Sequence, residues 1–449
     1  MYIPHTKEDQ EAMLERVGVR HLEELFQDVP ARFRFPELDL PPAMTEMEIL
    51  SEMRDISGAN DTVQDMACFL GAGAYYHYVP AAVDMILRRG EFYTAYTPYQ
   101  PEISQGTLQG IFDYQSLVTS LTDMDVSNAS HYDGATAVAE AVSLAVANFR
   151  GKRSKIVVSP AVHPHYRQTL KTYNGEDVLT ITGDEQSTEL DSGPDQLIPL
   201  IDMNTALVIV QYPDFFGRVF DYTYLIKAAH AVGALVSVSV NPIALGLLTP
   251  PGAFGADIVT GEGQPLGIPL SFGGPYLGLF ATKLEYVRKM AGRLVGETVD
   301  IRGQRAYVLT LTAREQHIRR EKATSNICTN QGLMALASTV YMSLLGKHGL
   351  RQVAELCYHK AHYAAKCIAE LPAYSLWSNE PFFNEFVFKC PAPVSEVNLH
   401  LQDYGILGGY DLGQDNPELV NHMLIAVTEM NTRDDIDSLV EALSEVSND

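Results

Sequence analysis

The chain has 449 residues, 46% of them hydrophobic and 20% charged, and this composition excludes disordered and fibrous proteins. With 32 basic and 56 acidic residues, its formal net charge is −24 at pH 7. A field of that sign repels a phosphate backbone, which argues against broad nucleic-acid binding.

The cysteines and the N-terminal residues both favour a cytoplasmic protein. The chain has an odd number of cysteines, with neither a CxxC pair nor a Cys/His cluster at zinc-ligand spacing. We therefore expect reduced thiols, without a metal site, at Cys68, Cys328, Cys357, Cys367 and Cys390. The first residues show neither a basic n-region nor an apolar h-region, so no export signal is predicted.

The first residues, 1–60, are predicted to form a helical arm. Glu8 to Val17 and His21 to Phe26 carry apolar residues at three- and four-residue spacing, and a proline-bearing extended run follows from Pro30 to Pro42. Such an arm is more often a packing element than a catalytic one. In oligomers, it commonly wraps a neighbouring subunit.

The next part, 61–325, is predicted to be a large α/β domain. Helical stretches alternate with short β-branched runs that are apolar on both sides, which is typical of a mostly parallel sheet covered on both faces. The predicted strands span 155–159, 178–181, 206–210, 234–238, 257–260 and 276–280, and the predicted helices include 135–149 and 222–232.

One long segment of this domain, 228–256, contains no Asp, Glu, Lys or Arg. Two proline-bearing pairs, Asn241-Pro242 and Pro250-Pro251, would break any helix long enough to span a bilayer. We therefore predict a buried strand and a loop that lie deep in the protein.

The last part, 326–449, is predicted to be a smaller α+β domain. A helical pattern runs from Asn330 to about Leu371, with Gly346 and Gly349 as expected breaks. Strands are predicted at 384–389 and 422–427, on either side of a Gly-rich turn at 407–409, and the closing helix is predicted at 434–446.

Two short motifs of the large domain could bind a ligand. Gly134, Ala135 and Thr136 open a predicted helix, where free backbone N–H groups and a hydroxyl could hold a phosphate, although a plain helix N-cap explains them equally well. His163 follows a strand end, where it could stack on a flat ring or simply be solvated.

Two polar segments have no hydrophobic period. The run from Tyr93 to Gly106 is too polar for a core and too aromatic for a linker, which favours a surface that meets another molecule. Cations and hydroxyls cluster from Arg319 to Cys328, at a predicted domain junction, where a salt-bridged hinge is the alternative.

These motifs resemble the glycine decarboxylase P-protein family, in the N-terminal-half type of its two-chain form. The resemblance runs over essentially the whole length, and it is carried by Phe69 to Pro80, Tyr96 to Gly106, Asn128 to Glu140 and Ile318 to Cys328. It implies the aspartate-aminotransferase fold of pyridoxal-phosphate (PLP) enzymes, fold type I, with a large mostly parallel-sheet domain and a smaller C-terminal α+β domain.

A PLP enzyme of this fold needs a lysine after a late strand, yet no lysine lies between Lys227 and Lys283. Gln264 or Pro265 stands at the expected position. The preceding strand ends in Asn241-Pro242, without the carboxylate that would pair with the cofactor's ring nitrogen. The resemblance therefore implies that PLP is carried by a lysine-bearing partner, subunit 2, in an assembly of two plus two chains. The pocket in this chain is expected to be vestigial, with Gly134, Ala135, Thr136, His163, Asn241 and Gln264 as its residues.

The activity implied by the resemblance is decarboxylation of glycine on PLP, followed by transfer of the aminomethyl group to the lipoyl arm of the H-protein. This chain is expected to contribute to a shared site in three ways. Tyr96, Thr97, Tyr99 and Gln100 would complete its wall. Lys322, Thr324 and Ser325 would reach towards a phosphate or carboxylate. Tyr75, Tyr76 and His77 would shape the tunnel for the lipoyl arm.

Two alternatives remain open from the sequence. The chain could be a self-contained PLP enzyme that uses Lys283, although this lysine follows the wrong strand. It could also be a purely structural, degenerate PLP-fold subunit that supports assembly or carrier docking. The tyrosine-rich run argues against the second alternative, because a buried scaffold interface would prefer apolar anchors.

Overall fold

The computed structural model describes residues 4–175, 179–184, 193–327 and 329–446. Cys328, and position 178 of the second predicted strand, lie outside the described residues. The chain divides into two compact units, Met1–Asp61 and Thr62–Asp449. The predicted boundary at residue 325 lies within the second unit and stays a prediction.

The first unit consists of short helical segments, and its two α-helices are capped at their N-termini by their own residues. Helices α1 (Lys7–Val17) and α2 (Glu46–Gly58) each begin with a threonine capping box, formed by Thr6 with Asp9 and by Thr45 with Glu48. Two 3₁₀ turns lie between them, η1 (Leu22–Phe26) and η2 (Ala31–Phe33). None of the residues described in these four elements is buried, so their apolar side chains have no core of their own.

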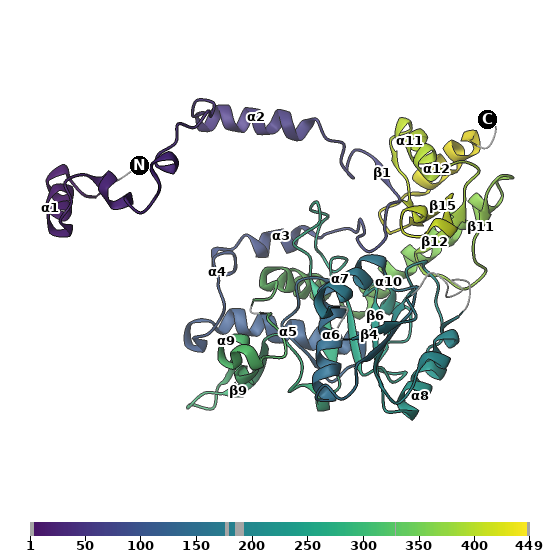
Figure 1. Cartoon of the computed structure of the whole chain (residues 1–449). Coiled ribbons are helices and arrows are strands. Elements are labelled where there is room, and N and C mark those ends of the chain that lie inside the picture. Colours follow the sequence, from purple (N-terminus) through teal and green to yellow (C-terminus); the bar gives the residue numbers. More distant parts are fainter. Residues whose placement is uncertain (1–3, 176–178, 185–192, 328, 447–449) are drawn as a thin grey trace. The chain divides into compact units, whose positions relative to one another are not determined.

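A seven-stranded sheet organises the second unit, in the order β2-β8-β7-β6-β5-β3-β4. Two of its strands, β4 and β6, are labelled in Figure 1. The five strands from β7 to β4 are parallel, whereas β8 and β2 run antiparallel to their neighbours. Their bounds are β2 Val126–Ser127, β3 Lys155–Val158, β4 Thr180–Thr182, β5 Thr205–Tyr212, β6 Leu235–Val240, β7 Ile258–Glu262 and β8 Gly278–Thr282. The predicted mostly parallel sheet is confirmed.

Both faces of this sheet are covered. Along β5, Val208 and Val210 belong to one core cluster, while Leu207 and Ile209 belong to another. Because side chains alternate along a strand, a strand that is apolar at every position must be buried on both faces. The main helices around the sheet are α5 (Gln105–Thr122), α6 (Gly134–Asn148), α7 (Pro164–Asn174) and α8 (Thr223–Ala231), with the 3₁₀ segment η4 (Pro194–Leu200).

The segment without charged residues forms the end of α8, strand β6 and the short η5 (Ala244–Gly246), so the predicted buried strand is confirmed. All six residues of β6 are buried. Among the described residues, no helix is long and apolar enough to cross a membrane.

A second, four-stranded antiparallel sheet lies in the C-terminal part, in the order β11-β12-β15-β14. The long helix α10 (Gly332–Ala369) connects it to the main sheet. Gly346 interrupts this helix with φ 57° and ψ −172°, whereas the break predicted at Gly349 is wrong, because the helix continues through it. The other elements here are β11 Ser375–Leu376, β12 Glu385–Lys389, β13 Ile406–Leu407, β14 Tyr410–Asp411, β15 His422–Ala426, α11 Val394–Asp403, α12 Arg433–Val446, η9 Leu412–Gln414 and η10 Pro417–Leu419.

The segment that follows the first unit packs on this C-terminal part. Strand β1 (Ala67–Cys68) pairs in parallel with β13, and Phe69 belongs to the C-terminal core cluster. The loop after β1 begins beside β15, where the N–H of Ala426 donates to the carbonyl oxygen of Phe69, and reaches the end of β7, where the N–H of Tyr75 donates to Gln264. The remaining elements are α3 Ala81–Leu87, α4 Gly90–Tyr93, η3 Pro101–Ile103, η6 Leu284–Tyr286, the hairpin β9 Leu294–Val299 with β10 Arg305–Thr310, η7 Thr312–Arg314, α9 Gln316–Arg319 and η8 Arg320–Lys322.

Candidate functional site

The carboxyl end of β7 points at the first turn of α6, where the sequence suggested a phosphate. The N–H of Gly134 donates to Oε2 of Glu262 at 2.9 Å. The other oxygen, Oε1, accepts from the N–H groups of Gln264 and Leu277, each at 3.0 Å. Glu262 is 8% exposed, and burial raises its pKa to about 8. A carboxyl group of the chain thus occupies the position where a helix N-terminus would hold an anion.

Gln264 stands next to it and is fully engaged by the protein. Its Nε2 donates to the carbonyl oxygens of Tyr75 and Ile268 at 2.9 and 2.8 Å, and its Oε1 accepts from the N–H of Tyr75 at 2.9 Å. The side chain is 1% exposed. A primary amide supplies both the donors and the acceptor that this position uses, which a lysine ammonium could not.

The stacked rings of His163 and Tyr166 lie beside the start of α6. The two rings stack, with centroids 4.7 Å apart and an angle of 17° between their planes. Nε2 of His163 lies 2.8 Å from the carbonyl oxygen of Ala72, and burial lowers the pKa of this histidine to about 4, so it is neutral near pH 7. A Cβ atom placed on Gly134 would lie 2.4 Å from the hydroxyl of Tyr166, so the tyrosine also lies against the start of α6.

The remaining residues predicted for the pocket have local partners. Thr136 and Asp133 form a capping box, in which Oδ1 of Asp133 accepts from the N–H of Thr136 at 2.8 Å. Ala135 follows in the first turn of α6. Oδ1 of Asn241 accepts from the N–H of Ile243 at 3.0 Å. The helix N-cap that the sequence left open is therefore present.

These residues do not fit PLP. Neither residue predicted at the anchor position, Gln264 or Pro265, carries an amine. The N–H of Gly134 is taken by Glu262, and a tyrosine ring stacks where His163 could meet a flat ligand. We derive no chemical step through PLP on this chain.

Lys283, the alternative anchor, lies at the other end of β7. Its Nζ is 2.5 Å from Oδ1 of Asp257, which directly precedes that strand, and 3.2 Å from the carbonyl oxygen of Gly255. Gln264 follows the strand at its opposite end. The length of β7 therefore separates Lys283 from the pocket.

Tyr75 ties the pocket to the C-terminal sheet. Its hydroxyl donates to Oε2 of Glu385 at 2.7 Å, and Oε1 of Glu385 accepts from the N–H of Ala72 at 2.8 Å. Burial raises the pKa of Glu385 to about 7. Tyr75 therefore lies inside the protein, with its polar groups used by contacts within the chain.

A separate cavity of about 190 Å³ lies beside α5 and the start of α10. Its wall includes Tyr93, Tyr96, Thr97, Asn330 and Leu333. Tyr96 is 77% exposed, so it stands at the outer rim, whereas Thr97 is half-buried. Two of the predicted wall residues thus share one hollow with the start of the C-terminal part.

Arg293 lies between the two polar segments that the sequence singled out. Its Nη2 donates to the hydroxyl of Tyr99 at 3.0 Å, and its Nε lies 3.7 Å from Oε2 of Glu315. The Arg293 side chain is only 4% exposed. Thr324 and Ser325 line a small hollow together with Arg293 and Glu315. The structure therefore brings Tyr99, Thr324 and Ser325 to one buried cation.

The other predicted site residues lie elsewhere. Gln100 and Lys322 are exposed, and Tyr76 is half-buried, with its carbonyl oxygen accepting from Thr428 at 2.7 Å. His77 is buried and turns towards Glu429.

The sequence analysis missed several residues of these sites. Arg293 and Glu315 had no signal in the sequence, since a lone arginine and a lone glutamate outside every predicted element look like any surface charges. Glu262 did have a signal in the sequence, because a carboxylate at the end of a buried strand needs a hydrogen-bond donor or a cation as its partner. Tyr166 acts through His163, three residues away, and through the start of α6 at Gly134. Glu385 acts through residues far away in the chain, Ala72 and Tyr75.

Comparisons with known proteins agree on one family. The model of the family described as glycine cleavage system P-protein matches residues 1–443. A protein of Thermomicrobium roseum named "Probable glycine dehydrogenase (decarboxylating) subunit 1" is 57% identical over the full length of both chains. A protein of Desulforamulus reducens with the same name is 52% identical, over 99% of this chain and 100% of its relative.

Solved structures extend this likeness. A crystal structure of glycine decarboxylase (P-protein) of the glycine cleavage system, in inhibitor-bound form, superposes with a TM-score of 0.90 at 42% identity, covering 99% of this chain and 100% of that one. The sphingosine-1-phosphate lyase of Burkholderia pseudomallei reaches a TM-score of 0.66 at 14% identity, covering 94% of each chain, and shares the fold alone. The predicted PLP-dependent fold type I is confirmed.

Proposed function

Because the chain belongs to the glycine cleavage system P-protein family, and to its subunit 1 type, we propose that it completes an active site whose PLP is held by a partner subunit. The name subunit 1 implies such a partner. One observation carries the proposal: side chains of the chain itself occupy the predicted cofactor position. Glu262 accepts the Gly134 N–H that a phosphate would need, and Gln264 bonds to the backbone of Tyr75.

In the proposed complex, the partner's lysine holds PLP, and the substrate is glycine. Bound to the partner, PLP would supply an acceptor for the electron pair that remains when CO₂ leaves, and the lipoyl arm of the H-protein would be the acceptor of the aminomethyl group. In this proposal, the residues of this chain bind glycine, orient the bond that breaks and keep water out of the site. Orientation of the scissile bond and a dry site are the contributions that a protein wall can make.

We propose that the wall consists of Tyr96, Thr97 and Tyr99, with Arg293 as the positioning residue behind them. Arg293 holds the Tyr99 hydroxyl, and its charge lies within reach of a carboxylate that enters beside Thr324 and Ser325. The tunnel role of Tyr75 and His77 is not part of this proposal, because both side chains are buried by contacts within the chain.

The first unit supports an assembly with another chain. Its helices bury none of their described residues, and Phe33, Leu38 and Met47 are 60%, 69% and 78% exposed. An apolar surface of this extent is typical of a segment that packs on a partner. We propose that residues 4–61 pack on the partner subunit, in an assembly of two plus two chains.

If Tyr99 belongs to the wall of the shared site, its substitution should lower turnover without preventing assembly of the complex. Tyr99→Phe removes the hydroxyl that Arg293 contacts, and we expect glycine–bicarbonate exchange by the assembled complex to fall about 10-fold or more, while the complex elutes unchanged on size exclusion. The matched control is Tyr363→Phe, whose hydroxyl contacts Asp437 on the exposed surface and should leave exchange unchanged. A purely structural subunit would show the reverse, with assembly lost before turnover.

The location of the cofactor gives a separate test. After incubation with PLP and reduction by borohydride, we expect the label on a lysine of the partner and none on this chain, measured by peptide mass spectrometry. A label on Lys283 or on another lysine of this chain would overturn the proposal.

A further inference from the structure

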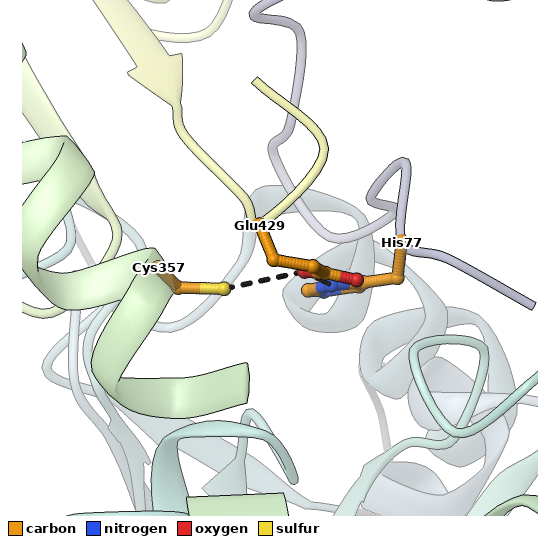
Figure 2. A group of neighbouring side chains, drawn as sticks. All are labelled: His77, Cys357 and Glu429. Atoms are coloured by element: carbon orange, nitrogen blue, oxygen red, sulfur yellow. Dashed lines mark hydrogen bonds and ion pairs between the residues drawn. The ribbon is translucent and has the colours of Figure 1, made fainter. Parts of the chain in front are cut away.

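Three potential metal ligands converge from distant parts of the chain. His77 lies in the loop after β1, Cys357 in α10, and Glu429 in the loop between β15 and α12 (Figure 2). One donor atom from each lies within 4.8 Å of the other two. No sequence pattern links them, since Glu429 is 72 residues from Cys357 and 352 from His77, which explains why the cysteine spacing predicted no metal site.

All three side chains are shielded from solvent. The side chains of His77 and Glu429 are 3% and 10% exposed, and Cys357 is fully buried. Nδ1 of His77 lies 2.7 Å from Oε2 of Glu429, and Sγ of Cys357 lies 3.5 Å from the same oxygen. The imidazole, the thiol and the carboxylate thus meet at a single point.

The second nitrogen of the imidazole has no use within the described part of the chain. Nε2 of His77 is buried without a hydrogen-bond partner there. Nδ1 is the nitrogen that faces the carboxylate, so it is the one that would bind an ion, and Nε2 would then carry the ring proton. A simple His–Glu ion pair explains the Nδ1 contact, but it leaves unexplained why a buried thiol is placed against the same carboxylate oxygen.

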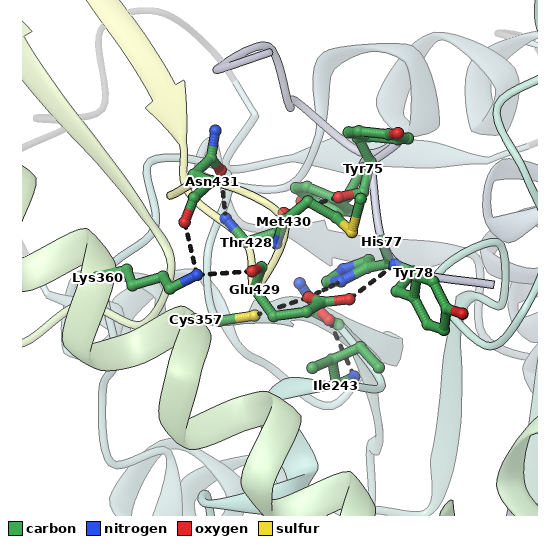
Figure 3. A network of polar contacts seen from close by, with 12 residues as sticks. Tyr75, His77, Tyr78, Ile243, Cys357, Lys360, Thr428, Glu429, Met430 and Asn431 are labelled. Carbon is green, nitrogen blue, oxygen red and sulfur yellow. Dashed lines mark hydrogen bonds and ion pairs between the residues drawn. The ribbon is translucent and has the colours of Figure 1, made fainter. Parts of the chain in front are cut away.

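The neighbouring cation does not serve as the counter-charge of the carboxylate. Nζ of Lys360 donates to the backbone carbonyl oxygens of Glu429 and Asn431, at 2.6 and 2.5 Å. Oε1 of Glu429 accepts from the N–H of Tyr78 at 2.8 Å (Figure 3). The surrounding groups therefore fix the backbone and one oxygen, and they leave Oε2 to face His77 and Cys357.

We propose that His77, Cys357 and Glu429 bind a divalent transition-metal ion of the Zn²⁺ class. Thiolate, imidazole and carboxylate together form a donor set that Zn²⁺ accepts and that Mg²⁺ and Ca²⁺ do not favour. Two ligands that are each about 2.0–2.3 Å from a tetrahedral ion lie about 3.3–3.8 Å apart, so the Sγ to Oε2 distance already fits. The shorter contact between His77 and Glu429 opens when the metal replaces the shared proton.

Binding is a proton-for-metal exchange without a redox step. The Cys357 S–H bond breaks and its proton goes to solvent, while the proton between Nδ1 of His77 and Oε2 of Glu429 moves to Nε2, so the imidazole stays neutral. The thiolate sulfur, Nδ1 and the carboxylate oxygen then bond to the ion. Water completes the fourth position. The ion would join the loop after β1, helix α10 and the loop before α12, which connect the two sheets, so its role is structural.

The test uses cobalt(II) as the probe on the full chain after removal of metal by chelation. We expect one Co²⁺ per chain, a thiolate-to-cobalt charge-transfer band in the near ultraviolet, and displacement by Zn²⁺. Cys357→Ser should abolish the band and weaken Co²⁺ binding at least about 10-fold. Cys367→Ser, a free thiol in the same helix, is the matched control and should keep both.

Folding is monitored separately so that a misfolded variant cannot mimic the result. If Cys357→Ser does not give the wild-type circular dichroism, Glu429→Gln takes its place, and we expect it to keep the charge-transfer band while its affinity falls at least about 10-fold. Zn²⁺ should raise the Tm of the wild type and not that of the variant. A wild-type chain without the band, or an equal loss in Cys367→Ser, would overturn the proposal.

Discussion

Replacing Arg218 by methionine is expected to lower the free energy of unfolding by about 3–5 kcal/mol. Arg218 and Asp214 form a buried ion pair, with side chains 3% and 2% exposed and Nε 2.8 Å from Oδ2. Without the guanidinium, the Asp214 carboxylate stays buried and loses its cation. Breaking one half of such a pair costs more than the pair itself contributes.

The same arginine holds the two parts of the second unit together. Its guanidinium lies over the rings of Phe216 and Trp377, at 5.4 and 4.9 Å from their centroids, and its backbone bridges to Phe382. Methionine would keep part of the packing but neither the charge nor the cation–π contacts. Urea unfolding can be followed by the fluorescence of Trp377, the only tryptophan of the chain, and by circular dichroism.

The pH dependence of this variant separates charge from packing. Burial raises the pKa of Asp214 to about 6, partly offset by Arg218, so removal of Arg218 should raise it further. An acid whose pKa is higher in the folded state is favoured in its protonated form, and its contribution to stability is lost as pH rises through that pKa. The variant should therefore be less destabilised at pH 5 than at pH 8. A loss that is the same at both pH values would indicate packing alone.

The control is Arg351→Met in α10. Arg351 forms an exposed pair with Glu355, with Nε 2.8 Å from Oε1, a geometry like that of the buried pair. Exposed pairs contribute at most about 1 kcal/mol, so we expect little change. Equal losses in the two variants would contradict the role assigned to burial.

Strands β3 to β8, β12 and β15 could be predicted because their evidence is local, whereas the short strands and the β9–β10 hairpin were not predicted. Strand β5 was expected at 206–210 and spans Thr205–Tyr212, since every residue of the run is apolar enough to be buried on one face or the other. The closing helix was expected at 434–446 and spans Arg433–Val446. The lack of a lysine between Lys227 and Lys283 could also be read from the sequence, because it does not depend on contacts with distant residues.

The sites depend instead on contacts between distant segments, which no local pattern contains. Tyr75 meets Glu385, which is 310 residues away in the chain, and Tyr99 meets Arg293, which is 194 residues away. The lysine gap predicted an unused pocket, but the sequence did not indicate that Glu262 fills it. Hydrophobic periodicity predicts the helices and strands, but it does not predict which distant side chains form hydrogen bonds once these elements have packed together.

Replacing Glu262 by leucine is the second change with a large expected effect, a loss of about 3–5 kcal/mol in the free energy of unfolding. The carboxyl group accepts three backbone N–H groups, those of Gly134, Gln264 and Leu277. Each buried donor that loses its acceptor costs about 1–3 kcal/mol. Glu262→Gln keeps the two bonds to Oε1 and turns an NH₂ group towards Gly134, so we expect a loss of about 1–3 kcal/mol.

Chemical denaturation of the purified chain measures both losses, and Glu297→Leu serves as the control. Glu297 lies on the exposed part of β9, where a substitution should change the free energy of unfolding by at most about 0.5 kcal/mol. Leucine at 262 should also leave the N–H of Gly134 without an acceptor, at the first turn of α6. A leucine variant as stable as the control would show that the three hydrogen bonds contribute nothing.

The charge state of Glu262 predicts the pH dependence of the whole chain. Its folded pKa is about 8, above its ordinary value of 4.5, because burial disfavours the ionised form more than the three N–H donors favour it. The resulting stability is present in full below pH 4.5 and is lost as pH rises to about 8. Glu385, with a pKa of about 7, acts in the same direction. We therefore expect the wild type to unfold more easily at pH 8 than at pH 6, and Glu262→Gln to show a smaller change. An equal change in both would assign the pH dependence to other groups.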